Sequence, residues 1–441
     1  MSESLLSVGL DVGTTSTQLV FSRLRVENHA GSFAVPQMEI TQREIIYKSP
    51  VHFTPLLRHE LVDAQRLREI VDGEYAAAGI TKAQVDTGAI IITGETSRKE
   101  NAHAVLEQLS GYAGDFVVAT AGPDLESVLA AKGAGAVDDS AQTGKTVLHM
   151  DIGGGTSNLA LIEDGKITAT TCLNVGGRLL KIDSHGHIIY KSPVLEEIFQ
   201  KRVGEVTSRE EVLELCEKLV QALEAASGLR ETEELTKKLH TAGAAVLSPP
   251  EKAVISFSGG VADCIAEEKP WLAFGDIGPE LGQTIRKSRL CQGQYRLGSE
   301  TIRATVIGAG CHSAQLSGST VFYQNIDFPL KNLPVVQSME SLRALDETGV
   351  LALRGSAATS YGALTELAEE IRQNFSGDTL ILALEQDVAK SLGQMLALRM
   401  GKNARILCID RIFLEEGSFL DVGAPVGPAL PVVVKTLILS G

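Results

Sequence analysis

The sequence of 441 residues predicts an α/β protein in which two similar domains face each other across a cleft and a C-terminal βαβ lobe follows. A short pattern carries the first part of this prediction. An apolar run, an acidic residue, a glycine-containing turn and a second apolar run occur at Val8–Phe21 and again at Val147–Ile162. Such a repeat indicates a duplicated domain. The second part rests on alternating strand and helix patterns after residue 330.

The stretch Val147–Ile162 has the features of a strand, a tight turn and a second strand. Asp151 ends the first apolar run, and Gly153–Gly155 and Thr156 form the turn. Glycines let the backbone turn sharply and approach a ligand. Their N–H groups and the Thr156 hydroxyl can face phosphate oxygens, and Asp151 can hold Mg²⁺ through water. An ordinary hairpin would carry the same residues, so this stretch alone leaves both interpretations open.

The stretch Val8–Phe21 makes an ordinary hairpin a weaker explanation, because it repeats the same order of residues. Asp11 ends an apolar run, Gly13, Thr14 and Thr15 follow it, and a second apolar run begins. Two acid-bearing turns in duplicated domains are expected to face each other across a cleft. Two carboxylates and two phosphate-binding turns suit a nucleoside triphosphate with its metal ion.

Composition limits the classes of partner. The chain is 44% hydrophobic and 22% charged, as is usual for a soluble globular protein. Its net charge of -15 disfavours nucleic acid as a partner, because no basic surplus exists to neutralise phosphates. Six scattered cysteines without a Cys-x-x-Cys pair favour a reducing cytoplasm over disulfides or zinc. No signal peptide or membrane span is expected, since no apolar run approaches about 20 residues.

Three domains are expected along the chain. Residues 1–140 form the first, with a strand-rich insertion, and residues 141–325 form the second, with a helical insertion near 178–250. Residues 326–441 form the C-terminal lobe. Apolar residues at helical spacing predict helices at 64–79, 126–135, 209–227, 231–247, 361–374 and 386–400.

Two further glycine pairs follow short apolar runs. Gly259 and Gly260 follow a predicted strand, and Gly308 and Gly310 follow another in Arg303–Ser313. Either turn could let an adenine or ribose lie flat on the backbone. Each alone is a weak signal, because a glycine pair after a strand is often a packing turn.

The order of these motifs resembles the actin, hexokinase and Hsp70 ATPase superfamily, over roughly residues 5–315. The resemblance rests on the two acid-bearing turns, a helix beginning near Glu126, and the glycine pairs Gly176–Gly177 and Gly259–Gly260. It implies two ribonuclease-H-like α/β domains, of the actin-like ATPase kind, that clasp ATP and Mg²⁺ in a cleft.

At closer range the whole chain resembles the ethanolamine ammonia-lyase reactivating factors of bacterial ethanolamine utilisation. Ser7–Gln18, Ser256–Asp263 and Leu414–Pro425 carry this resemblance. It implies an ATP-dependent chaperone that acts on a lyase whose adenosylcobalamin has been damaged. ATP-driven movement would loosen the lyase so that intact adenosylcobalamin replaces the damaged one. It also implies a cytoplasmic protein associated with the ethanolamine bacterial microcompartment.

The superfamily resemblance assigns roles by position. Asp11 and Asp151 would hold Mg²⁺ through water, and Glu126 would orient the attacking water, with Glu95 as a second candidate. No counterpart of the phosphate-contacting lysine of Hsp70 is found. The residues expected to touch the nucleotide are Gly13, Thr14, Thr15, Gly153, Gly154, Gly155 and Thr156 at the phosphates, with Gly259 and Gly260, or Gly308 and Gly310, at the adenosine.

Two other functions stay open at this point. A metabolite kinase of the same fold would need an acid to accept a substrate hydroxyl proton, and Glu95 or Asp263 could serve. An ATP-coupled hydrolase of the hydantoinase and oxoprolinase type is the other, because Thr305–Ser313 resembles that group. Phosphate release without a small acceptor would favour the chaperone over both.

Overall fold

A computed structural model describes most of the chain. The described residues are 3–13, 16–28, 38–58, 61–93, 101, 105, 109, 117–120, 123–232, 234–241, 247, 249, 253–312, 314–316, 321–343, 348–354, 360–414, 418–425 and 430–436.

The first domain is built on a mixed sheet with the strand order β3-β2-β1-β7-β8, and β4 pairs with the start of β2. β1 and β2 form an antiparallel hairpin, whereas β7 runs parallel to β1. Its elements are β1 (Glu3–Val12), β2 (Ser16–Asn28), β3 (Met38–Lys48), β4 (His52–Phe53), β5 (Leu56–Arg58), β6 (Leu61–Val62), α1 (Ala64–Ala78), η1 (Lys82–Gln84), β7 (Thr87–Ile92) and β8 (Val117–Thr120).

Helix α1 covers one face of this sheet. Asp63 caps its N-terminus by accepting a hydrogen bond from the Arg66 N–H, and Gly79 ends it in the left-handed region. Leu67, Val71 and Tyr75 lie one turn apart and are buried against alternate residues of β1, β2 and β7. The helix predicted at 64–79 is therefore confirmed.

The second domain repeats the first. Its sheet has the order β11-β10-β9-β14-β15, again an antiparallel hairpin flanked by a third antiparallel strand and by a parallel one. This correspondence confirms the duplicated α/β fold. Its strands and short helices are β9 (Val147–Ile152), β10 (Ser157–Glu163), β11 (Lys166–Leu173), β12 (Leu180–Ile182), β13 (Ile188–Lys191), η3 (Pro193–Leu195), β14 (Val254–Ser258), η4 (Arg289–Cys291) and β15 (Tyr295–Leu297).

One face of the second sheet is covered by the predicted helical insertion. The α5 helix starts with a capping box at Ser208 and buries Val212, Leu215 and Leu219 in the core. The predicted helix at 231–247 is shorter than expected, because it ends at Leu239 and the chain then pairs with β11. The helices of this face are α5 (Arg209–Ala226), α6 (Glu234–Leu239), α7 (Ala262–Ala266) and α8 (Gly278–Lys287).

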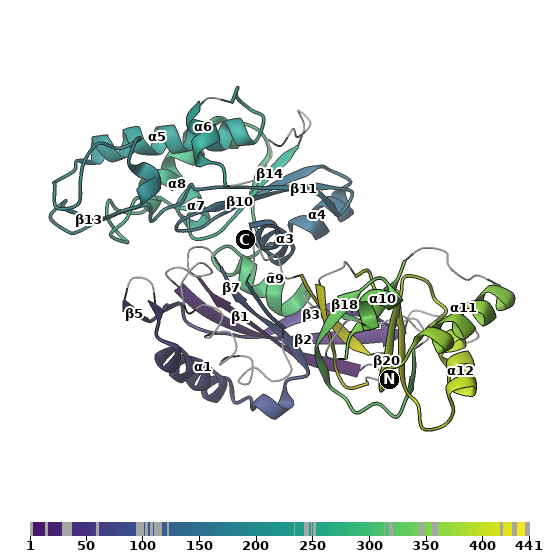
Figure 1. Ribbon diagram of the computed structural model, residues 1–441. Coiled ribbons are helices and arrows are strands. Elements are labelled where there is room, and N and C mark those ends of the chain that lie inside the picture. The colour runs from purple at the N-terminus through teal and green to yellow at the C-terminus, as the bar shows by residue number, and fades with distance from the viewer. Residues whose placement is uncertain are drawn as a thin grey trace.

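Two helices are exchanged between the domains and lie between them in Figure 1. The α3 helix (Pro123–Gly133), followed by α4 (Ala136–Thr143), precedes the second domain in sequence and packs against β9, β10 and β11. The α9 helix (Ala304–His312) comes from the opposite direction and packs against β1, β2 and β7 of the first domain. The domain boundary expected after residue 140 falls inside α4 and leaves α3 with the first domain in sequence, although both helices pack on the second.

The strand and turn expected at 303–313 are wrong, because this segment is α9. Gly308 on α9 and Gly133 on α3 allow the two helices to cross at close range. A Cβ at Gly133 would lie 1.9 Å from the Ala304 carbonyl oxygen, and one at Gly308 would lie 2.0 Å from that of Leu129. The two helix backbones therefore touch directly. A short apolar run cannot distinguish a buried strand from a buried helix by its periodicity.

The C-terminal lobe contains the predicted βαβ unit within a larger mixed sheet of order β16-β23-β22-β18-β19-β20-β21-β17. It adjoins the first domain, through contacts of β23 with β8 and of β16 with β3 and α9, and lies beside that domain in Figure 1. Its elements are β16 (Ala314–Leu316), β17 (Phe322–Gln324), β18 (Leu330–Val336), α10 (Met339–Arg343), β19 (Val350–Leu353), α11 (Tyr361–Asn374), β20 (Thr379–Leu384), α12 (Ala389–Met400), β21 (Arg405–Asp410), β22 (Ser418–Val422) and β23 (Pro431–Thr436).

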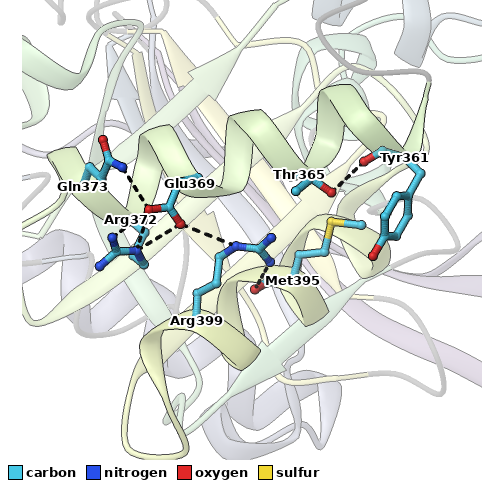
Figure 2. A network of polar contacts seen from close by, with 7 residues as sticks. All are labelled: Tyr361, Thr365, Glu369, Arg372, Gln373, Met395 and Arg399. Atoms are coloured by element: carbon cyan, nitrogen blue, oxygen red, sulfur yellow. Dashed lines mark hydrogen bonds and ion pairs between the residues drawn. The ribbon is translucent and has the colours of Figure 1, made fainter.

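Polar contacts join the two helices of this lobe on their outer side (Figure 2). Glu369 on α11 accepts hydrogen bonds from Arg372 and Gln373 and pairs with Arg399 on α12 at 3.7 Å. These donors lower the pKa of the Glu369 carboxyl to about 2. The pairs are exposed to solvent, so we assign them a small part in stability.

Within the described residues, no helix is long and apolar enough to cross a membrane.

Candidate functional site

The same hydrogen bond closes both predicted turns. The Gly13 N–H donates to the Ser16 carbonyl oxygen at 2.9 Å, and the Gly153 N–H donates to that of Thr156 at 2.9 Å. Each bond closes a turn between two antiparallel strands. The repeat seen in the sequence is therefore a repeat of local structure, at the same end of both sheets.

The side chains of Asp11 and Asp151 project from the sheet faces that the exchanged helices cover. Leu10 and Val12 pack toward α1, so the side-chain alternation of β1 turns Asp11 toward the face that α9 covers. Met150 and Ile152 likewise pack toward α5, which turns Asp151 toward the face that α3 covers. Both carboxylates thus point into the region between the two domains.

The two carboxylates are close enough to interact. Burial raises the pKa of Asp151 to about 6 and that of Asp11 to about 7, and the negative charge of Asp151 adds to the shift of Asp11. Asp151 ionises at a lower pH than Asp11, so its negative charge is already present when Asp11 titrates. Two aspartates 140 residues apart in the sequence are therefore neighbours in the structure.

A chain of hydroxyl and imidazole groups orients Asp151. Its carboxylate accepts hydrogen bonds from the hydroxyls of Ser258 and Thr305. The Ser258 oxygen lies 2.9 Å from His149 Nε2, and Ser256 Oγ lies 3.1 Å from His149 Nδ1. Burial lowers the pKa of His149 to about 3, so its ring is neutral and donates from one nitrogen only. That nitrogen is Nε2, because Ser258 already donates its hydroxyl proton to Asp151 and can only accept a hydrogen bond from the His149 ring.

Asp11 has a corresponding donor in the first domain. The Thr93 hydroxyl, at the end of β7, donates to Asp11 Oδ1 at 2.8 Å. Ser258, at the end of the parallel neighbour β14, is the direct partner of Asp151, whereas Thr93 lies two residues beyond Ile91, the β7 partner of Asp11. A hydroxyl from the parallel neighbouring strand, or directly after it, thus orients each aspartate without cancelling its charge, although the two hydroxyls occupy different register positions.

Each of the two aspartates has a buried amide side chain as its cross-strand neighbour. Asp11 pairs across its hairpin with Gln18, and Asp151 pairs with Asn158. Gln18 donates through Nε2 to the Ile302 carbonyl oxygen at 3.1 Å, so its Oε1 remains an acceptor. Within the described part of the chain, Gln18 Oε1 and Asn158 Oδ1 are buried without a hydrogen-bond partner. Such groups are costly unless a bound species satisfies them.

These groups fit a hydrated divalent cation. Two carboxylates and two amide oxygens offer acceptors only, and the water molecules around a cation are donors. The described residues contain no group of three or more acids, histidines or cysteines placed to hold a metal directly. Mg²⁺ does not need one, because it keeps several of its waters and is usually held through one or two carboxylates and phosphates.

Glu126 belongs to the same region. It is buried on α3 and accepts a hydrogen bond from Asn158 Nδ2 at 2.8 Å, which places it beside the Asp151 hairpin. Three other predicted site residues, Glu95, Thr14 and Thr15, lie outside the described residues.

The glycines of the second domain divide into open and packed positions. Nothing lies within 4 Å of a Cβ built on Gly155, whereas the Arg178 side chain lies 3.4 Å from one built on Gly154. Gly259 is structural, because its φ is 85° and a Cβ there would lie 2.3 Å from the Ile152 carbonyl oxygen. Gly260 is open, with only Ile302 at 4.0 Å. A ligand can thus approach the backbone at Gly155 and Gly260.

The nucleotide contacts expected of Gly308 and Gly310 do not fit the structure. Both are buried inside α9, where Gly308 lies against α3. A Cβ on Gly310 would lie 3.0 Å from the Gly9 nitrogen in β1. These glycines permit helix packing and leave no open backbone for an adenosine. Of the two turns left open by the sequence, the structure retains the one at Gly259 and Gly260.

Sequence reasoning missed several groups that the structure brings to the site: Thr93, Gln18, Asn158, Ser258 and Thr305. A signal was available for the amides, because Gln18 and Asn158 stand at the same distance after Asp11 and Asp151. Thr305 carried no such signal, since it reaches Asp151 from a helix that packs on the other domain.

The chain is similar over nearly its whole length to one family of known proteins. The family described as ethanolamine utilisation protein EutA matches residues 3–350 and 341–440. A protein of Salmonella typhimurium named ethanolamine ammonia-lyase reactivase EutA is 38% identical, and one of Escherichia coli with the same name is 37% identical; each alignment covers 98% of both chains. Among solved structures, the Aquifex aeolicus PPX-GPPA enzyme is 13% identical, with a TM-score of 0.43 over 69% of this chain and 99% of that chain.

The family match spans nearly the whole chain, and two relatives exceed 30% identity over nearly their full length. The chain therefore belongs to the EutA family of ethanolamine utilisation proteins.

Proposed function

We propose that this protein is an ATP- and Mg²⁺-dependent reactivating chaperone for adenosylcobalamin-dependent ethanolamine ammonia-lyase. It releases damaged cobalamin from the lyase, so that intact adenosylcobalamin can bind again. Membership of the EutA family supports this function, and so do the two relatives named as reactivases of that lyase. We place the activity in the cytoplasm, at the ethanolamine bacterial microcompartment.

The single observation that carries the nucleotide part is the paired set of Asp11, Gln18, Asp151 and Asn158. Two charged and two neutral acceptors converge between the domains, and the amide oxygens lack partners among the described residues. When bound, Mg²⁺ supplies positive charge that neutralises the triphosphate. Asp11 and Asp151 would hold the cation through its water shell, and the amide oxygens of Gln18 and Asn158 would serve as further acceptors for that shell.

The turns supply the remaining contacts with ATP. The backbone around Gly155 and the Thr156 hydroxyl would approach the phosphates from the second domain, and Gly13 would do so from the first. The contacts expected of Thr14 and Thr15 lie outside the described residues. Gly260 offers open backbone to the adenosine. Glu126 accepts the proton of the attacking water or orients it, and its bond to Asn158 holds it beside the second turn. Phosphoryl transfer needs such positioning and charge neutralisation more than a covalent nucleophile.

Movement follows from the place of the site. ATP and ADP differ by the phosphate that both turns hold, so they favour different separations of the two hairpins. The crossing of α3 with α9 lies between the sheets and is the natural pivot for this change. The lyase would respond to the arrangement of the domains that the nucleotide selects.

The test is reactivation of lyase that has been inactivated by turnover. The protein, ATP, Mg²⁺ and fresh adenosylcobalamin should together restore ethanolamine deamination, and omission of ATP should prevent recovery. Asp11→Asn and Asp151→Asn should each lose recovery. Asp72→Asn is the matched control, because Asp72 is exposed and paired with Lys82 at 3.0 Å.

Equal recovery without ATP would contradict the proposal. Phosphate release should also occur without a small-molecule acceptor, and this distinguishes the chaperone from a metabolite kinase or an ATP-coupled hydrolase. Turnover that requires a sugar, an acid or a cyclic amide would favour one of those alternatives.

A further inference from the structure

A cavity of about 510 Å³ opens at the edge of the second sheet, away from the two hairpin turns. Helices α3 and α4 form one wall and β11 forms the other, and these three elements lie together in Figure 1. The β11 strand is an edge strand, so its outer side is free to line a groove. The lining residues are Val128, Lys132, Val137, Gly165, Lys166, Ile167, Thr168, Ala169 and Thr170.

The described lining combines positive charge with an apolar floor. Lys132 from α3 and Lys166 from β11 stand on opposite walls, and no acidic residue is among them. Neither lysine ammonium group has a hydrogen bond or ion pair with any described residue, although Glu163 is the cross-strand neighbour of Lys166. This is unusual in a chain with a net charge of -15, where carboxylates outnumber cations.

Lys132 is the more informative of the two lysines. Burial lowers its pKa, and the nearby Arg43 guanidinium lowers it further. Arg43 donates to the Cys311 carbonyl oxygen at 3.0 Å. Burial lowers the pKa of His312 to about 3, and the charges of Arg43 and Lys132 add to this shift. A half-buried cation among other basic groups is costly to keep, and an anion removes that cost.

We propose that this cavity binds a small organic anion whose phosphate, sulfonate or carboxylate group lies between Lys132 and Lys166 and whose apolar body lies on Val128, Val137 and Ile167. The volume is in the range of small-molecule sites, about 300–1,000 Å³. Such a site consists of an apolar lining with a few convergent polar groups, as found here.

The probe is anilinonaphthalene sulfonate, which joins an apolar body to one anionic group, compared with its uncharged parent phenylnaphthylamine. The full-length protein should bind the sulfonate saturably at one site, measured by fluorescence titration. Lys132→Met keeps the length of the side chain and removes its charge, so affinity for the sulfonate should fall by roughly tenfold. Lys132→Arg should retain binding, and affinity for phenylnaphthylamine should not change in either variant.

Lys145→Met is the matched control, because Lys145 is exposed, lies outside the cavity and donates through its ammonium to Gln294 at 3.1 Å. Should Lys132→Met not fold, Lys166→Gln on the exposed start of β11 tests the opposite wall with the same expected loss. The proposal is overturned if the charge-removing variants bind the sulfonate within about twofold of the wild type. It is equally overturned if the uncharged probe binds as tightly as the sulfonate, since the lysines would then have no part in recognition.

Discussion

Replacing Asp11 with asparagine should make the nucleotide-free protein more stable. The introduced amide would be neutral at every pH, and its oxygen can still accept the Thr93 hydroxyl proton. The wild-type carboxyl keeps its proton in the folded state up to a pKa of about 7, whereas the unfolded chain loses it near 3.8. The unfolded state therefore gains free energy from ionisation as the pH rises through this window, and wild-type stability falls.

The magnitude follows from the two pKa values. A difference of about 3 units, at 1.36 kcal/mol per unit, gives about 4 kcal/mol at pH 8, where both states are ionised. At pH 5 only the unfolded carboxyl has ionised, and the same linkage gives about 2 kcal/mol. The advantage of Asp11→Asn should thus grow between pH 5 and pH 8 and level off above that.

The assay is urea unfolding of both proteins with a metal chelator and no nucleotide, at a series of pH values, with midpoints converted to free energies of unfolding. Asp72→Asn should change stability by less than about 1 kcal/mol without this trend, because its ion pair is exposed. A variant less stable than the wild type at pH 8 would refute the reasoning. A difference that does not change with pH would do the same, because it would show that ionisation of Asp11 is not the cause.

Three other predictions test the site and the helix crossing. Binding of Mg²⁺ and ATP at pH 7 should release about half a proton, since Asp11 is then about half protonated and the cation requires the ionised carboxylate. Calorimetry in buffers of different ionisation enthalpy measures the number of protons released. A binding enthalpy that does not depend on the buffer would contradict this prediction. Gln18→Leu should weaken Mg²⁺-dependent ATP binding by roughly tenfold, as outer-shell changes do, and an unchanged Mg²⁺ titration would remove the amide from the site. Gly308→Ala should cost about 2 kcal/mol or more, because its Cβ would lie 2.0 Å from the Leu129 carbonyl oxygen. Gly362→Ala on α11 is the control, because no described atom lies within 4 Å of a Cβ built on Gly362. Its stability in thermal melts should be unchanged or slightly higher. Equal losses of stability in both variants would exclude the helix crossing as the cause.

The sequence was most informative where a local pattern repeats. Asp11 and Asp151 could be placed at the ends of buried strands, because an apolar run, an acid and a glycine turn have one simple structural solution. Their meeting could be expected from the duplication, and their mutual effect on pKa agrees with it. The helices at Ala64–Ala78 and Tyr361–Asn374 were predictable for the same reason, since each has a regular apolar stripe and a capping residue directly before it.

Prediction failed where structure depends on a distant partner. The residues of α9 form a helix that buries most of its surface, so its sequence lacks the polar face that would have revealed the period. Thr305 reaches Asp151 only because α9 crosses to the other domain, and no spacing in the sequence encodes that contact. Lys132 gave no signal either, because its environment is made by Arg43 and by β11, far away in the chain.

The exchange of α3 and α9 makes each half of the duplicated unit incomplete by itself. A fragment ending at Thr120 would expose the apolar surface of β1, β2 and β7 that Val306 and Ile307 cover, and a fragment beginning after Gly133 would keep α4 but expose the part of β9 and β10 that α3 covers. Separate expression of either fragment should yield insoluble material, and joint synthesis should not restore the assembly, because α3 (Pro123–Gly133) belongs to neither fragment. We therefore expect the duplicated unit to fold only as a whole, since each half supplies a helix that covers the sheet of the other.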